Sequence, residues 1–199
     1  MMTLTPRKII GLVASFVLPL TFFSAAAAAE PKMEIDSTVQ AVIKILTNPA
    51  LKHNESERRQ LLRRASAARF DFRQMAKRSL GPYWHRQTAA QKDKFVRLFT
   101  ELLEKAYLAR IESYHGDKII YTGKRVSRDY AEVDSKILTP AGREYSLDYL
   151  LERTGNDWKI YDVIVDDVSI VNSYRSQFDD VIDRYSYREL VRRMEEKLS

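Results

Sequence analysis

The histidines are the first candidates for chemistry, because an imidazole can transfer protons or bind zinc. His53, His85 and His115 lie far apart in the sequence, each in a polar or turn context. A catalytic or zinc-binding role needs partners at short spacing, as in H-E-x-x-H, and the sequence has no such motif. It also has no cysteine, which excludes thiol chemistry and thiolate metal ligands. We therefore interpret the histidines as ordinary surface residues.

Other signatures of catalysis are equally absent from the sequence. It contains no G-x-S-x-G elbow, no phosphate-binding glycine loop and no dinucleotide fingerprint. Asp166–Asp167 and Asp179–Asp180 are adjacent aspartate pairs, and adjacent side chains on a strand or helix point apart. The sequence therefore predicts no catalytic residue, no metal site and no cofactor. Carboxylates that the fold brings together from distant positions remain an open alternative.

The aromatic side chains are the most unusual feature, and they fall largely on the predicted inward faces of helices and strands. A solid core explains any single one of them. Together they could instead line an apolar cavity, with tyrosine hydroxyls fixing a ligand near its mouth. The periodic pattern is the same for both interpretations and does not decide between them.

Basic residues crowd one stretch, namely Arg58, Arg59, Arg63, Arg64, Arg69, Arg73, Lys77 and Arg78. The simplest interpretation is a solvated helix face, because long basic side chains commonly lie on such faces. The alternative is an electrostatic footprint for anionic head groups or an acidic partner. The positive excess of the whole chain is mild, which does not favour nucleic acid as a partner.

Periodic apolar residues predict helices on both sides of a central region of strands. The expected N-caps are Asp36 or Ser37 for the first helix, and then Asp71, Thr88, Ser169 and Ser186. The clearest helix begins at Thr88, because it combines a capping box with one broad apolar stripe. The expected helices cover residues 35–46, 57–69, 71–80, 88–107, 170–182 and 187–198.

Between residues 119 and 165 the apolar period changes to two, which is typical of strands. We expect four strands over 119–126, 131–137, 145–151 and 158–165, joined by short turns into an antiparallel meander. The fold class is therefore α+β, with helices packed on a curved four-strand antiparallel sheet. A long amphipathic helix across such a sheet can leave a cone that is open at one end and holds an apolar cavity.

The first 29 residues have the three-part layout of a secretory signal peptide. Arg7 and Lys8 precede an apolar run over 9–23, and small residues follow up to Ala29. The run is shorter than the roughly 20 residues that a membrane span needs, and Pro19 interrupts it. We therefore expect cleavage before Glu30 and a single domain over residues 30–199 in an exported protein.

Several motifs together resemble the MlaC family, the periplasmic phospholipid-binding proteins also described as toluene-tolerance proteins. They cover nearly the whole of residues 30–199 in the family's order. One departure is Asp166-Asp167, since the family usually has a glycine just before the Val168-Ser169 pair; this leaves the local turn open. The matching stretches are Phe70-Asp71-Phe72, Met75-Ala76, Leu80-Gly81, Trp84, Thr88 to Gln91 with Phe95 and Phe99, Trp158 to Val163, and Val171 to Phe178.

The resemblance implies a cone like that of nuclear transport factor two, extended by extra helices, with acyl tails inside and the head group outside. It implies a soluble periplasmic carrier that shuttles glycerophospholipid between an inner-membrane ABC-transporter complex and an outer-membrane lipoprotein complex. This transport would support the lipid asymmetry of the outer membrane. The family has no catalytic residues to carry over, so no enzymatic activity is expected.

A phospholipid shuttle is therefore the leading hypothesis. Arg175 is a candidate for the cavity mouth or a partner surface, and segment 81–84 and the start of the helix after Ser169 are candidates for a movable element. One alternative is a cone-fold enzyme, similar to isomerases and dehydratases, which would need an inward-facing carboxylate. Another is an adaptor with a solid core or a non-lipid ligand. The candidate lipid-binding residues are Phe72, Met75, Leu80, Phe95, Phe99, Leu102, Tyr107, Val133, Ile137, Tyr145, Leu147, Tyr149, Trp158, Val171, Tyr174 and Phe178.

Overall fold

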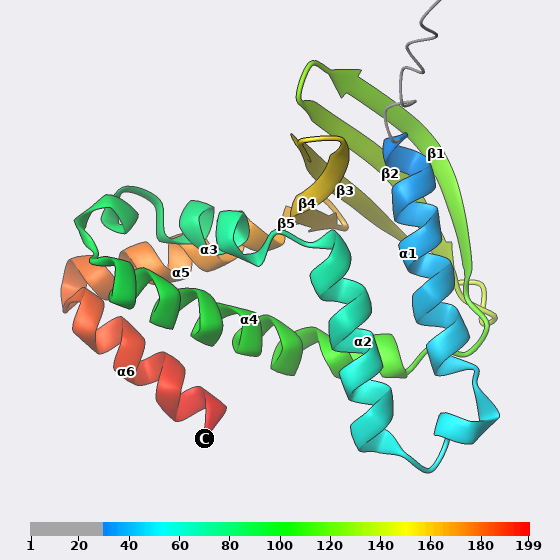
Figure 1. The fold of residues 1–199 in the computed structure, drawn as a ribbon, viewed down its shortest axis with the longest axis horizontal. Helices are drawn as coiled ribbons and strands as arrows, with labels where there is room; N and C mark the ends of the chain where they lie inside the picture. Colours follow the sequence, from blue (N-terminus) through cyan, green and yellow to red (C-terminus); the bar gives the residue numbers. More distant parts are fainter. Residues whose placement is uncertain (1–29) are drawn as a thin grey trace, which may run out of the picture.

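The computed structural model describes residues 30–199 (Figure 1), so the expected signal peptide lies outside the described residues. The strands are β1 (Lys118–Ser127), β2 (Tyr130–Leu138), β3 (Glu144–Thr154), β4 (Asp157–Val165) and β5 (Val168–Ser169). The helices are α1 (Pro31–Leu46), α2 (Glu55–Arg69), α3 (Phe72–Leu80), α4 (Ala89–Glu112), α5 (Ile170–Arg184) and α6 (Tyr187–Leu198), with short 3-10 helices η1 (Pro49–Leu51) and η2 (Gly81–Arg86).

The strands form one antiparallel sheet in the order β1-β2-β3-β4-β5. The four expected strands are all present, and the structure adds β5, which pairs with the end of β4. The turn before β5 holds Asp166 and Asp167 at φ angles of 46° and 63°. These aspartates therefore adopt the left-handed conformation that glycine takes most easily, so the missing glycine does not abolish the turn.

Helix α1 lies across one face of the sheet (Figure 1). Its Ile35 is fully buried against the inward side chains of β2, β3 and β4, and Val39 packs beside it. The helix begins at Pro31, a residue favoured at the first helical position, and the Glu30 carboxylate accepts a hydrogen bond from the Met33 N–H. The prediction that Asp36 or Ser37 caps this helix is therefore wrong, because Glu30 and Pro31 provide an earlier start.

Helices α3 to α6 form a separate helical layer beside the sheet (Figure 1). The long helix α4 packs there against α3 and α6, whereas α1 is the helix that crosses the sheet. The predicted capping box of α4 is present, because Thr88 and Gln91 exchange both hydrogen bonds. Asp71, Ser169 and Ser186 cap α3, α5 and α6 as expected.

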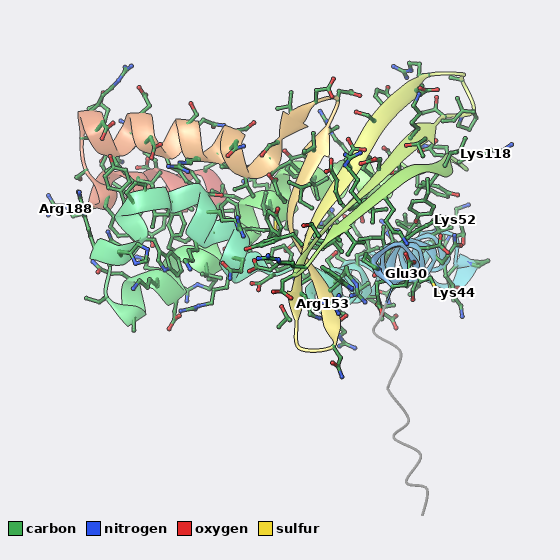
Figure 2. The ribbon with its side chains drawn as sticks, turned by 90° about the horizontal axis from the view of Figure 1, so that it is seen from above. Glu30, Lys44, Lys52, Lys118, Arg153 and Arg188 are labelled. Carbon is green, nitrogen blue, oxygen red and sulfur yellow. The ribbon has the colours of Figure 1, made fainter. Side chains whose placement is uncertain are left out.

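The buried apolar side chains gather into two clusters. We call one the helical cluster, formed by α3 to α6 with Trp84, and the other the sheet cluster, formed by Ile35 with β2, β3 and β4. Figure 2 shows the two parts side by side, with the helices at one end and the sheet and α1 at the other. Phe70 and Ile170 pack against both clusters. The interior is therefore divided along a seam between helices and sheet.

Candidate functional site

Most of the expected lipid-binding residues lie in the helical cluster. The rings of Phe99 and Tyr174 meet edge to face at 5.3 Å between centroids, and those of Phe95 and Phe178 do so at 5.6 Å. Such edge-to-face contacts are a favoured aromatic geometry. The expected residues in this cluster are Met75, Leu80, Phe95, Phe99, Leu102, Val171 and Phe178, with Phe72, Tyr107 and Tyr174 packed against it and partly buried.

The remaining expected residues lie on the sheet. Val133, Tyr149 and Trp158 are buried in the sheet cluster, and Leu147 packs against it. Ile137 and Tyr145 face each other across β2 and β3 and are half-buried, outside both clusters. Apart from Ile137 and Tyr145, the structure thus brings the expected residues together as two groups on either side of the seam.

Tyr149 places a polar group inside the sheet cluster. Its side chain is buried among the apolar side chains of this cluster. Burial raises the pKa of this hydroxyl above its ordinary value, so the group stays protonated at neutral pH. A hydroxyl that keeps its proton can donate a hydrogen bond to a polar atom of a ligand.

Asp36 of α1 and Tyr121 of β1 form a polar contact at the edge of the sheet cluster. The Tyr121 hydroxyl donates to Asp36 Oδ1 at 3.3 Å, and Lys32 Nζ lies 5.4 Å from the centre of the tyrosine ring. This is the kind of carboxylate–tyrosine pair that the enzyme alternative required. Burial and the nearby carboxylate raise the pKa of Tyr121, so it holds its proton instead of exchanging it at neutral pH.

A hollow of about 320 Å³ lies where α3 and η2 meet α5 and the sheet. We call it the basic hollow, because Lys77, Arg78, His85 and Arg175 line it. Gly81 is also in its wall, and a Cβ on this residue would lie 3.2 Å from Arg175 Nε. The hollow therefore joins segment 81–84 to the start of α5, the two segments expected to form a mouth.

Asp162 is the one carboxylate among the residues that line the basic hollow, and it is buried. It accepts hydrogen bonds from the Ser169 hydroxyl at 2.5 Å, the Val171 N–H at 3.0 Å and the Val163 N–H at 2.8 Å. The carboxylate thereby holds the first turn of α5 against β4, where the helix dipole favours negative charge. This structural role accounts for its burial.

A second, larger hollow of about 660 Å³ lies at the far end of the helical layer. Its wall includes Tyr83, whose hydroxyl donates to Asp183, and Tyr187. Neither hollow is lined by the expected lipid-binding residues, apart from Val171 beside the basic hollow. In this structure the inward aromatic side chains pack against one another.

The basic cluster of the sequence holds the helices together. Arg58 and Arg59 both contact Glu112 of α4, at 3.0 Å and 3.5 Å, and Arg63 contacts Glu104. Because these cations form ion pairs within the chain, the basic stretch as a whole is not a free positive surface for anionic head groups or an acidic partner. Among the described residues, the cluster members without an ion pair are Arg64 and Lys77.

Residues 30–199 contain neither a membrane-spanning helix nor a cluster of metal ligands. No helix in this part of the chain is both long and apolar enough to cross a membrane. The same residues contain no group of three or more histidine and acidic side chains that could hold a metal ion.

Comparison with known proteins places the chain among its relatives. The profile of the family described as MlaC protein matches residues 36–196. The chain belongs to the MlaC family. This match runs from α1 to α6 and thus includes both clusters and the basic hollow.

Curated members of the MlaC family align with a smaller part of the chain. The intermembrane phospholipid transport system binding protein MlaC of Haemophilus influenzae is 26% identical over 125 residues, which are 60% of this chain and 58% of that protein. Toluene tolerance protein ttg2D of Pseudomonas putida is 29% identical over 103 residues, 51% of this chain and 48% of that protein. These alignments span about half the length of the relatives.

A solved structure matches the MlaC-family fold over a greater length. It is a phospholipid-binding protein from Ralstonia solanacearum in complex with a phospholipid, and it superimposes with a TM-score of 0.78 at 25% identity. The match covers 85% of this chain and 97% of that one. The predicted fold class, helices with an open curved antiparallel sheet, is thereby confirmed.

Some residues of this MlaC-family site were missed by sequence reasoning. Asp162 carries no local sequence signal of a buried carboxylate, because its burial depends on hydrogen bonds to Ser169 and to the start of α5. In the sequence, Lys77 and Arg78 stand out only as part of a basic stretch. Their approach to Arg175 depends on the packing of α3 against α5, which a local sequence pattern does not contain.

Proposed function

We propose that this protein is a soluble periplasmic carrier of glycerophospholipid. It takes lipid from one membrane complex and delivers it to another, between an inner-membrane ABC-transporter complex and an outer-membrane lipoprotein complex, and so supports outer-membrane lipid asymmetry. The observation that carries the proposal is the superposition on the Ralstonia solanacearum protein, which holds a phospholipid and is matched over 97% of its length. Membership of the MlaC family supports the same conclusion.

The acyl chains lie along the seam between the helical cluster and the sheet cluster, against the expected residues that belong to these clusters or pack against them; Ile137 and Tyr145 extend this lining along β2 and β3. The seam suits this role because few side chains bridge it, so parting the clusters disrupts little packing. Each buried methylene contributes about 0.8 kcal/mol, so two chains of roughly 15 carbons cost on the order of 24 kcal/mol to expose to water. A dry carrier is therefore required for transfer between membranes.

The carrier needs no chemical step. The buried tyrosines keep their protons at neutral pH, and the buried carboxylate Asp162 is already used to hold α5. Transfer depends on binding and release alone, with the hydroxyl of Tyr149 available to an ester oxygen near the acyl chains.

Native mass spectrometry of gently purified periplasmic protein tests the proposal. The expected spectrum contains protein that begins at Glu30 and carries about one diacyl phospholipid, which lipid extraction of the same sample identifies. Repeated lipid-free spectra from such material would contradict the carrier function. A mass that retains residues 1–29 would contradict the expected cleavage, without bearing on lipid binding.

A further inference from the structure

We propose that the basic hollow is a binding site for a phosphate group. It is separate from the seam, because Leu150 in its wall projects from the sheet face opposite to the one that α1 covers. The phosphate is either free or part of a phospholipid head group. The second case rests on the proposed carrier function, and the first does not.

The composition of the wall favours an anion. Lys77 and Arg78 come from α3, His85 comes from η2, and Arg175 comes from α5. Lys77 has no ion pair within residues 30–199, and Arg175 has a loose one, 3.7 Å from Asp179. Cations from two helices, α3 and α5, with the ring N–H of His85 beside them, form an arrangement that can bind phosphate oxygens.

Two contacts fix the position of the Arg78 guanidinium in the wall of the hollow. Its guanidinium stacks 4.0 Å above the centre of the Tyr161 ring, and one terminal nitrogen donates to Glu152 at 3.1 Å. Its Nε is shielded from solvent and has no hydrogen-bond partner among the described residues. A shielded N–H without an acceptor is costly, so a small shift of Arg78 that brings its Nε to a phosphate oxygen in the hollow would remove this cost.

The single carboxylate in the wall does not repel the anion strongly. Asp162 is buried and accepts three hydrogen bonds, so its charge is already solvated by N–H and O–H groups. The flanking carboxylates Glu152 and Asp179 offset part of the positive charge. We therefore expect modest affinity, with a dissociation constant on the order of 1 mM for inorganic phosphate.

The size of the hollow and its backbone fit a small ligand. About 320 Å³ accommodates a phosphate with its first attached group, and not a folded partner. Gly81, with φ at +56°, brings the chain close to the Arg175 guanidinium where a side chain would crowd it. The wall also contains Leu150 and Val171, which suit the apolar part of a phosphate ester.

The test is an NMR titration of lipid-free protein with inorganic phosphate, with sodium chloride at equal ionic strength as the reference. Saturable shifts of the Gly81 and Asn172 amides are expected. Lys77→Ala and Arg175→Ala should each weaken phosphate binding about tenfold, since each removes one charge-assisted contact. Arg64→Ala is the matched control, because Arg64 is exposed and has no ion pair among the described residues, and it should leave the affinity unchanged.

Three outcomes would overturn the proposal: shifts that chloride reproduces, affinities that the two variants leave intact, or acetate binding as tightly as phosphate. The last result would indicate a carboxylate site suited to an acidic protein partner. Far-UV circular dichroism of each variant shows whether it is folded. A misfolded variant is replaced by Lys77→Gln or Arg175→Gln, which keep more of the side chain.

A second arm separates the two sources of phosphate. Protein loaded with phosphatidylglycerol is compared with protein loaded with diacylglycerol, which lacks the phosphate. If the head group occupies the hollow, only the diacylglycerol complex binds added phosphate. If both complexes bind it equally, the ligand is free phosphate. Failure to load either lipid would contradict the carrier function. The titration of lipid-free protein would still show whether the basic hollow binds phosphate.

Discussion

Asp167 adopts a left-handed backbone conformation that is strained for residues other than glycine. Its φ of 63° lies in the left-handed region, its side chain is exposed, and the chain there makes the tight turn into β5. Glycine adopts such angles without a clash between its Cβ and the following carbonyl. Asp166 and Asp167 thus occupy a turn in which glycine would be less strained.

We predict that Asp167→Gly raises the free energy of unfolding by about 0.5–1 kcal/mol, because the strain is relieved at a small entropic cost. Urea unfolding followed by circular dichroism measures the change. Asp166→Gly is the matched control: it relieves similar strain but loses the hydrogen bond that Asp166 Oδ1 accepts from the Ser146 N–H at 3.0 Å, so it should gain less. A destabilised Asp167→Gly protein would contradict this account.

At the scale of elements, Arg69 joins α2 to both α1 and β4. Its buried guanidinium donates to Asp157 Oδ1 at 2.7 Å and to the Trp158 carbonyl at 2.5 Å, and it pairs with Glu34 of α1. Burial alone would raise the pKa of Asp157, but hydrogen bonds from Lys159 and Arg69 outweigh it and lower the pKa to about 2. The Arg69 side chain thus connects α1 to β4, which are distant in sequence.

We predict that Arg69→Met lowers the free energy of unfolding by about 2–3 kcal/mol at pH 7, because Glu34 and Asp157 lose their shared partner. The stabilisation from ionised Asp157 is complete above its ordinary pKa of 3.8 and is lost as pH falls towards 2. The difference between the variant and the wild type should therefore shrink over that range. Arg63→Met, which removes an exposed pair, should change stability by no more than about 0.5 kcal/mol.

Local signals in the sequence were sufficient for most elements. The capping box at Thr88 and the period-two pattern of the strands predicted α4 and the first four strands correctly. The start of α1 was missed, because Glu30 is an uncommon N-cap and the signal came from Pro31. β5 was missed because two residues carry no periodicity, and its pairing depends on the conformation of Asp166 and Asp167.

The arrangement of the site was less predictable than its elements. Inward faces identify which side chains are buried, but not which cluster each one joins. The division into a helical and a sheet cluster depends on α1, rather than α4, covering the sheet. Likewise, the basic hollow brings Lys77 and His85 next to Arg175, which is distant in the sequence and approaches them only through tertiary packing.

At the scale of the whole molecule, the two tryptophans report on the two clusters separately. Trp158 is 1% exposed in the sheet cluster and belongs to the proposed lipid lining, whereas Trp84 is 6% exposed in the helical cluster and does not. The chain contains no other tryptophan. Each can therefore be observed alone after the other is replaced by phenylalanine.

We predict that a phospholipid with brominated acyl chains quenches most of the emission of the Trp84→Phe variant, in which Trp158 remains. The Trp158→Phe variant, which retains Trp84, should be quenched much less, because bromine quenches over short range and Trp84 lies outside the proposed lining. Unbrominated lipid is the control for effects of binding alone. Equal quenching of the two variants would contradict the proposed position of the chains along the seam.

The position of α6 has a consequence for how the molecule is made. This final helix, Tyr187–Leu198, contributes Leu190, Val191 and Met194 to the helical cluster, where they pack with side chains of α3, α4 and α5. During synthesis, the apolar side chains of α3, α4 and α5 stay uncovered until α6 has been made, so the helical cluster closes only after this segment emerges. The buried members of the sheet cluster, in contrast, all precede α5 in the sequence, so the two clusters become complete at different stages of synthesis.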